Sequence, residues 1–127
     1  MSLSNTISFT CRAGDATISK TETITGEARK SYRVSVPDST DDQLVDVAFL
    51  IDDLKFAYIL SDQNVTLETN NGGAPVDTIN LTANKPAVWT DYLDGLLGSL
   101  FSQTVTAFYF TNASGATASI TIEILHD

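Results

Sequence analysis

The residues that could do covalent chemistry are few in this chain. Its one histidine is His126 and its one cysteine is Cys11. Nucleophilic catalysis needs a nucleophile, a base within hydrogen-bond reach and a group that orients the base. Because His126 stands beside the last residue, we expect it to be mobile and a poor general base. Cys11 falls on the apolar face of an alternating run, so we expect a small buried side chain there.

Carboxylates are more numerous, and some of them are adjacent. Asp41-Asp42 and Asp52-Asp53 are pairs, and Asp38 is close to the first pair. Loop oxygens can bind calcium, which takes about six to eight oxygen ligands. The spacing of an EF-hand does not occur, so solvated turn residues are the simpler interpretation, and calcium at residues 38–42 is the alternative. A glycosidase also needs two carboxylates that face one cleft, which any acidic chain could offer.

Motifs that bind phosphate or build a nucleophile elbow do not occur in the sequence. We find no phosphate-binding glycine loop, no dinucleotide-binding glycine pattern and no Gly-x-Ser-x-Gly. A cysteine-based zinc site does not fit a chain with one cysteine. We therefore predict no catalytic residue, no metal site and no cofactor, and a protein that is not an enzyme.

The charge excludes one class of partner. Sixteen acidic and 7 basic residues give a formal net charge of −9, which repels phosphate and argues against nucleic-acid binding. Arg29, Lys30 and Arg33 form the main basic cluster, which we interpret as solvated charges at strand ends. The first residues lack a basic region followed by an apolar run, and no stretch approaches about 20 apolar residues, so we expect no signal peptide and no membrane partner.

The elements that must position these residues are strands. Apolar and polar side chains alternate through most of the chain, as in residues 7–11, 32–36, 65–69 and 120–124. Residues 44–60 could form a helix, but their β-branched and aromatic content and the acidic pair favour two strands. About nine short strands spaced about 8–12 residues apart predict an all-β fold, an antiparallel β-sandwich or barrel. With no linker or repeat, residues 1–127 form one predicted domain.

Residues 92–101 break the alternation. Gly95 and Gly98 interrupt an unusually apolar run, which predicts a loop or a short helix. Its apolar side chains either cap the open end of the sandwich or bury against another subunit, and exposed apolar patches mark interaction sites. The candidate interface residues are Tyr92, Leu93, Leu96, Leu97, Leu100 and Phe101.

Three stretches carry a family resemblance. They are residues 61–70, Asp77-Thr78-Ile79-Asn80-Leu81 leading to Val88-Trp89, and Phe110-Thr111-Asn112-Ala113-Ser114-Gly115. In that order they resemble the head-decoration (cement) proteins of jelly-roll type from tailed bacteriophages and prophages, best over residues 43–127. The resemblance implies a structural virion protein made in the cytoplasm of the bacterial host. It also implies a homotrimer on the outer surface of the phage head that binds the major capsid protein and stabilises the icosahedral shell.

Three other functions stay open at this point. A β-sandwich could bind carbohydrate or a host surface through exposed aromatic rings such as Trp89, Tyr58, Tyr92 and Tyr109. The protein could equally be a tail or baseplate component. A hydrolase with paired carboxylates, such as Asp41 and Asp52, is the least supported of the three.

Overall fold

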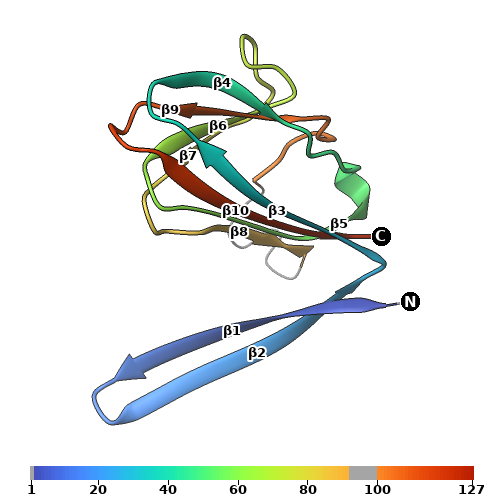
Figure 1. Ribbon diagram of the computed structural model, residues 1–127. Coiled ribbons are helices and arrows are strands. Elements are labelled where there is room, and N and C mark those ends of the chain that lie inside the picture. Colours follow the sequence, from blue (N-terminus) through green and yellow to red (C-terminus); the bar gives the residue numbers. More distant parts are fainter. Residues whose placement is uncertain (1, 92–99) are drawn as a thin grey trace.

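The structure, a computed structural model, describes residues 2–91 and 100–127. It is an all-β fold in which two antiparallel sheets pack as a sandwich, as the alternation predicted. A third, two-stranded sheet stands apart from them (Figure 1). The described part of the chain has no helix long and apolar enough to span a membrane. The strands are β1 (Leu3–Ala13), β2 (Ala16–Gly26), β3 (Ala28–Val36), β4 (Thr40–Val45), β5 (Leu54–Ser61), β6 (Val65–Thr69), β7 (Thr78–Leu81), β8 (Ala87–Thr90), β9 (Phe108–Asn112) and β10 (Ala118–His126).

The order of the strands in the sandwich is that of a jelly roll. One sheet runs β3-β10-β5-β8 and the other β4-β9-β6-β7. Counted from β3 as the first of eight, the strands therefore lie in the orders 1-8-3-6 and 2-7-4-5, so that neighbours within each sheet come from distant parts of the chain. A double-sheet roll of eight strands is the jelly-roll arrangement. We call the two sheets the β3 sheet and the β4 sheet.

The main core lies between these two sheets. In β6 and β9 buried and partly exposed residues alternate, because successive side chains point to opposite faces. Phe101 stacks on Phe108 with ring centroids 5.8 Å apart and meets Phe49 edge-on at 5.3 Å. The largest fully buried side chains are Phe101, Phe108, Phe110, Ile59, Leu67, Ile120, Ile122, Ile124, Leu125, Val36, Val47 and Val105.

The middle of the chain differs in detail from the sequence prediction. Residues 44–60 form no α-helix, and their second half is in β5, as predicted. The first predicted strand is wrong, because β4 ends at Val45 and residues 46–50 lie outside the strands, before a short 3-10 turn at Ile51–Asp53. β4, in turn, starts at Thr40, among the acidic residues 38–42 that were interpreted as solvated turn residues. Ser39 and Asp42 have φ of 63° and 53°, and the β4–β9 register shifts between Thr40 and Gln43. A tight turn and a bulge thus begin the strand early.

Two predictions about reactive side chains are wrong. Cys11 is exposed, because the first strand turns away from the sandwich. His126 is not at a mobile end: it closes β10 and pairs with Ala28 on one side and Leu54 on the other. Pairing on both sides holds the strand end in place although it is close to the C-terminus.

Candidate interface on the N-terminal hairpin

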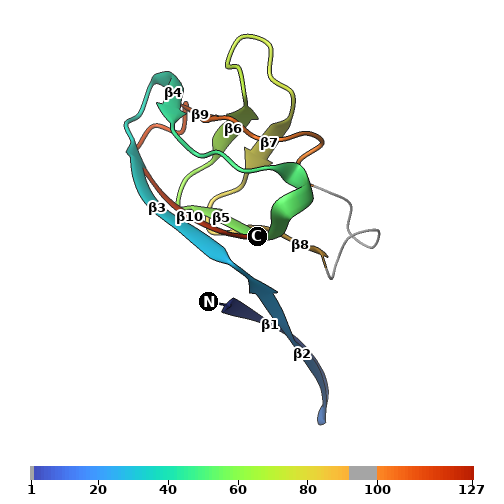
Figure 2. The same cartoon turned by 90° about the vertical axis from the view of Figure 1, so that its right-hand side faces the viewer.

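The most exposed part of the described structure is the hairpin of β1 and β2, which we call the arm (residues 3–26). Its strands have 11 residues each and are joined by Gly14 and Asp15, since Ala13 pairs with Ala16. Gly14 has a φ of +61°, as the first central position of a type II′ hairpin turn requires. Figures 1 and 2 show the arm beyond the β3 sheet, on the side away from the β4 sheet, with its tip pointing off the body.

The register divides the arm into two different faces. Residues that pair directly across a hairpin point to the same side, and the side alternates along each strand. One face holds only hydroxyl side chains and one arginine: Ser4, Thr6, Ser8, Thr10, Arg12, Thr17, Ser19, Thr21, Thr23 and Thr25. We call the other the apolar face; it holds Leu3, Asn5, Ile7, Phe9, Cys11, Ala13, Ala16, Ile18, Lys20, Glu22, Ile24 and Gly26.

The base of the apolar face is packed against the body. Ile24 forms a buried cluster with Phe56 and Leu125 on the outer side of the β3 sheet, and Leu3 and Ile7 pack around it. A side chain at Gly26 would not fit, because a Cβ there would lie 2.9 Å from Leu125 Cγ and 3.0 Å from the His126 carbonyl oxygen.

Hydrogen bonds fix the base of the arm as well. The Arg29 side chain donates to the Ser4 carbonyl oxygen at 2.9 Å and to the side chain of Asn5. The Glu27 amide donates to the His126 carbonyl oxygen at 2.9 Å. The arm therefore leaves the body from a defined place and in a defined direction.

The outer half of the same face is solvent-exposed. Ile18 is 72% exposed and Phe9 40%, and they lie beside Cys11, which pairs with Ile18. A shallow depression on this face is lined by Phe9, Cys11, Ile18 and Lys20 among others. Lys20 and Glu22, at the middle of the face, form an ion pair of 3.0 Å. Phe9, Cys11 and Ile18 thus form a small exposed apolar group beside this ion pair.

The arm also differs from the body in charge. Arg12 and Lys20 balance Asp15 and Glu22, so the formal charge of the arm is zero and the rest of the chain carries all of the −9. An acidic or neutral protein surface can thus approach the arm more easily than it can approach the body.

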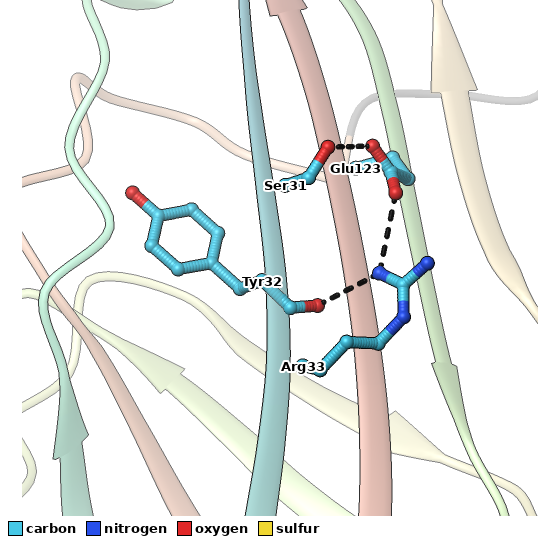
Figure 3. A network of polar contacts seen from close by, with 4 residues as sticks. All are labelled: Ser31, Tyr32, Arg33 and Glu123. Carbon is cyan, nitrogen blue, oxygen red and sulfur yellow. Dashed lines mark hydrogen bonds and ion pairs between the residues drawn. The ribbon is translucent and has the colours of Figure 1, made fainter.

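The basic cluster lies at the root of the arm: Arg29 and Lys30 stand near the start of β3, as the strand-end interpretation predicted, whereas Arg33 is in the middle of that strand. Lys30 and Arg33 are inside β3, where Lys30 donates to the Ala48 carbonyl oxygen. Figure 3 shows that Ser31 and Arg33 reach Glu123 from the same side of the sheet, while the Tyr32 ring lies on the other. The Arg33–Glu123 contact is 3.2 Å and largely exposed, so it contributes little to stability. Arg33 is thus paired with Glu123 within the sheet, while Arg29 and Lys30 donate hydrogen bonds to uncharged oxygens outside it.

The sequence-predicted interface segment is only partly described. Phe101 is 2% exposed and belongs to the main core, and Leu100 packs against that core from a half-buried position. These two positions fit the capping alternative. Tyr92, Leu93, Leu96 and Leu97 lie outside the described residues, so their part in an interface stays a prediction.

The acidic pairs do not form a described metal site. Within residues 2–91 and 100–127, no three His, Cys, Asp or Glu side chains are grouped so that they could hold a metal ion. Asp41 and Asp42 instead accept hydrogen bonds from Thr111 Oγ1, at 3.2 and 3.4 Å. Glu68 lies near them, and its pKa is raised, first by partial burial and then by the charges of Asp42 and Asp41. This corner of the β4 sheet repels further negative charge.

The aromatic rings considered for sugar binding are placed differently from one another. Trp89 is 8% exposed and sits in the main core, where it cannot stack on a sugar ring. Tyr58 packs around the cluster at the base of the arm, and Tyr109 is half-buried. Tyr92 lies outside the described residues.

The arm itself was missed as a separate element at the level of sequence, although two signals point to it. Gly14-Asp15 between two alternating runs is a typical hairpin turn. Lys20 and Glu22 stand at positions that a sandwich core would fill with apolar side chains.

Comparisons with known proteins assign no function to these surfaces. No protein-family model, curated protein or solved structure matches this chain.

Proposed function

We propose that this protein is a structural component of a tailed-phage or prophage virion, which decorates the outside of the icosahedral head and stabilises it by binding the major capsid protein. The observation that carries the proposal is the jelly-roll body with a projecting, neutral arm whose outer apolar face is uncovered. A protein of this form offers contact surfaces to other proteins. The proposal includes that the protein is not an enzyme.

The fold supports the proposal without deciding it. Jelly rolls occur in viral capsid proteins and also in lectins and cupins, so a fold alone does not fix a function. The resemblance of residues 43–127 to head-decoration proteins favours the first of these. One stretch that carries the resemblance, residues 110–115, covers the end of β9 and includes Asn112, whose side chain is fully buried. The resemblance there thus includes a residue that shapes the fold.

The charge supports a place on the outside of a head. An acidic body has no electrostatic attraction to packaged DNA, and it favours contact with neutral or basic protein surfaces. We further propose that the protein assembles as a homotrimer and that Tyr92, Leu93, Leu96 and Leu97 contribute to its contacts with the capsid or with its own copies.

The proposal is tested on virions and on purified heads. Mass spectrometry of gradient-purified virions of the phage that encodes the protein should detect it in the head fraction at a fixed ratio to the major capsid protein. Heads stripped of the protein should bind purified protein to saturation in a sedimentation assay. Absence from virions, or no saturable binding to expanded heads, would overturn the proposal, and enrichment in the tail fraction would favour a tail or baseplate role instead.

A pair of variants tests the predicted contact segment. Leu97→Asp should weaken head binding at least about tenfold if Leu97 is in the contact, because a buried unpaired carboxylate is costly. Leu50→Asp is the matched control, since Leu50 is 60% exposed. If Leu97→Asp unfolds the protein in circular dichroism, the segment is part of the core and the contact lies elsewhere; if it folds and binds heads as well as the control, residue 97 is outside the contact.

A further inference from the structure

The loop between β6 and β7 contains the one Asn-Gly pair of the sequence, Asn71-Gly72. This loop lies on the side of the molecule opposite the arm (Figures 1 and 2). An asparagine before a glycine can close a cyclic imide, because the next backbone nitrogen attacks the side-chain carbonyl carbon and glycine has no side chain in the way. Asn71 is exposed, so water reaches such an imide and ammonia can leave. The loop is therefore a candidate site of covalent change.

Two backbone amides hold the side-chain oxygen of Asn71. The Gly73 amide donates to Oδ1 at 2.8 Å, and the Ala74 amide donates to it at 3.2 Å. The first hydrogen bond closes a ring that runs through Asn71 Cγ and the Gly72 nitrogen, so the side chain is folded back along the Gly72 peptide. Holding two reacting groups together in this way lowers the barrier of an intramolecular attack.

The same two amides face the atom on which charge develops. When the Gly72 nitrogen adds to Asn71 Cγ, the carbonyl oxygen Oδ1 becomes an oxyanion. Backbone N–H groups that already point at such an oxygen stabilise the tetrahedral intermediate, as in an oxyanion hole. The turn at Asn71 therefore favours the addition to its own side-chain amide.

The neighbours of this turn hold it in place. Asn70 donates from Nδ2 to the Thr104 carbonyl oxygen at 2.9 Å, and its Oδ1 accepts from the Thr106 amide at 2.8 Å. The Asp42 carboxylate lies so close to Gly72 that a Cβ at this position would be 2.5 Å from Asp42 Cγ. The turn is thus anchored on one side by hydrogen bonds and closely packed on the other.

We propose that Asn71 is a site of spontaneous deamidation, which the folded loop promotes. The Gly72 nitrogen loses its proton to hydroxide and forms a bond to Asn71 Cγ; the Cγ–Nδ2 bond then breaks, and Nδ2 takes a proton from water and leaves as ammonia. Water opens the resulting succinimide at either carbonyl and gives aspartate or isoaspartate. The net reaction consumes one water and turns a neutral amide into a carboxylate and an ammonium ion. It goes beyond the proposed function, because it needs neither an enzyme nor a capsid.

The product adds a negative charge to the acidic corner of the β4 sheet. The formal charge becomes one unit more negative than −9. Gly72 lies against Asp42, and the pKa of Glu68 is already raised, first by partial burial and then by the charges of Asp42 and Asp41. A carboxylate at position 71 adds to this repulsion, so a deamidated molecule repels acidic surfaces more strongly at this corner than an unmodified one does.

The test follows purified full-length protein during incubation at neutral and at mildly alkaline pH. Ion-exchange chromatography should show a growing acidic species, and peptide mass spectrometry should place the exchange of nitrogen for oxygen at residue 71. Asn71 should react at least about tenfold faster than any other asparagine of the chain. The rate should rise with pH, because the attacking nitrogen must lose its proton. Both aspartate and isoaspartate should appear.

A pair of variants shows that the acidic species comes from this residue. Asn71→Gln should abolish it, because the longer side chain must close a larger and less favourable ring. Asn80→Gln is the matched control, since Asn80 is also exposed but precedes Leu81 inside β7, and the species should form as in the wild type. Circular dichroism checks that both variants are folded.

The same protein unfolded in guanidinium chloride measures what the fold contributes. At equal pH the folded protein should react at least as fast at residue 71 as the unfolded protein, because the turn already holds the reacting atoms together. A slower reaction in the folded protein would mean that the turn protects Asn71, and would overturn the proposal. So would another asparagine that reacts at a similar rate. A product with aspartate but no isoaspartate would also overturn it, because that product indicates direct hydrolysis of the side-chain amide.

Discussion

Asn112 should be one of the most sensitive positions in the protein. Its side chain is fully buried at the end of β9. Its amide nitrogen donates to the Val36 carbonyl oxygen at 2.9 Å and to the Ala116 carbonyl oxygen at 2.8 Å. Its oxygen accepts from the Ser114 amide at 3.0 Å. One side chain thus ties the end of β3 to the turn between β9 and β10.

The size of the effect follows from these three bonds. Asn112→Ala leaves the two carbonyl oxygens and the Ser114 amide without this partner, and each buried polar group left unpaired costs about 1–3 kcal/mol. Some of these groups can reach water after relaxation, so we expect the free energy of unfolding to fall by about 2–5 kcal/mol. Asn112→Asp keeps the shape and the acceptor but turns an oxygen toward both carbonyls, and we expect a loss of about 3–5 kcal/mol at neutral pH.

The aspartate variant also has a defined pH dependence. Burial and two facing carbonyl oxygens disfavour the charged form, so the pKa of the new carboxyl at position 112 is raised in the folded state above about 3.9 in the unfolded state. The loss of stability is therefore full above the raised pKa. It shrinks as the pH falls through that value, because the protonated acid can donate to one carbonyl.

Urea denaturation followed by circular dichroism measures both variants. The midpoint should fall with little change in the slope of the unfolding free energy against urea. Asn80 gives the matched control: it is exposed and accepts one long hydrogen bond of 3.4 Å from Thr66, so its Ala and Asp variants should stay within about 0.5 kcal/mol of the wild type. The reasoning fails if Asn112→Asp is as harmless as Asn80→Asp.

Three further predictions concern the corners of the fold. The raised pKa of Glu68 means that its charged form is disfavoured in the folded state. As the pH falls from the raised pKa toward about 4.3, the free energy of unfolding of the wild type should therefore rise relative to that of Glu68→Gln. Equal urea midpoints for both proteins across this range would contradict this prediction. Phe101→Ala should cost about 3–5 kcal/mol in urea denaturation, because a ring 2% exposed leaves a core cavity, and a loss below about 1 kcal/mol would show that residue 101 is not core. Gly26→Ala should speed amide hydrogen exchange in the arm by about tenfold or more, because the new Cβ would meet Leu125 and the His126 carbonyl; unchanged exchange would show that the close approach at the base is not needed.

Some elements of the fold were predictable because local chemistry decides them. The alternation at residues 65–69 and 120–124 predicted strands, and both are strands with one buried face. An apolar stripe with a period of two must be covered on one side, which predicted packed sheets before any pairing was known. The predicted all-β sandwich is confirmed.

Other elements could not be predicted because long-range contacts decide them. Val47 and Phe49 are buried, yet they lie outside the named strands that residues 44–60 were predicted to form; Phe49 makes only an isolated bridge, to Val105. That bridge joins segments far apart in sequence, and no local pattern specifies such a partner. His126 is held for the same reason, by pairing with strands whose positions the sequence does not state.

The arm separates most clearly what the sequence pattern determines from what only the tertiary contacts determine. The sequence by itself determined that residues 7–11 form a strand with Ile7, Phe9 and Cys11 on one face, and the structure agrees. It did not determine what that face contacts. Periodicity fixes which side chains share a face, because it follows from the geometry of a single strand. Burial depends on what lies opposite, and only the tertiary structure shows that the base of the arm meets the body while the tip does not.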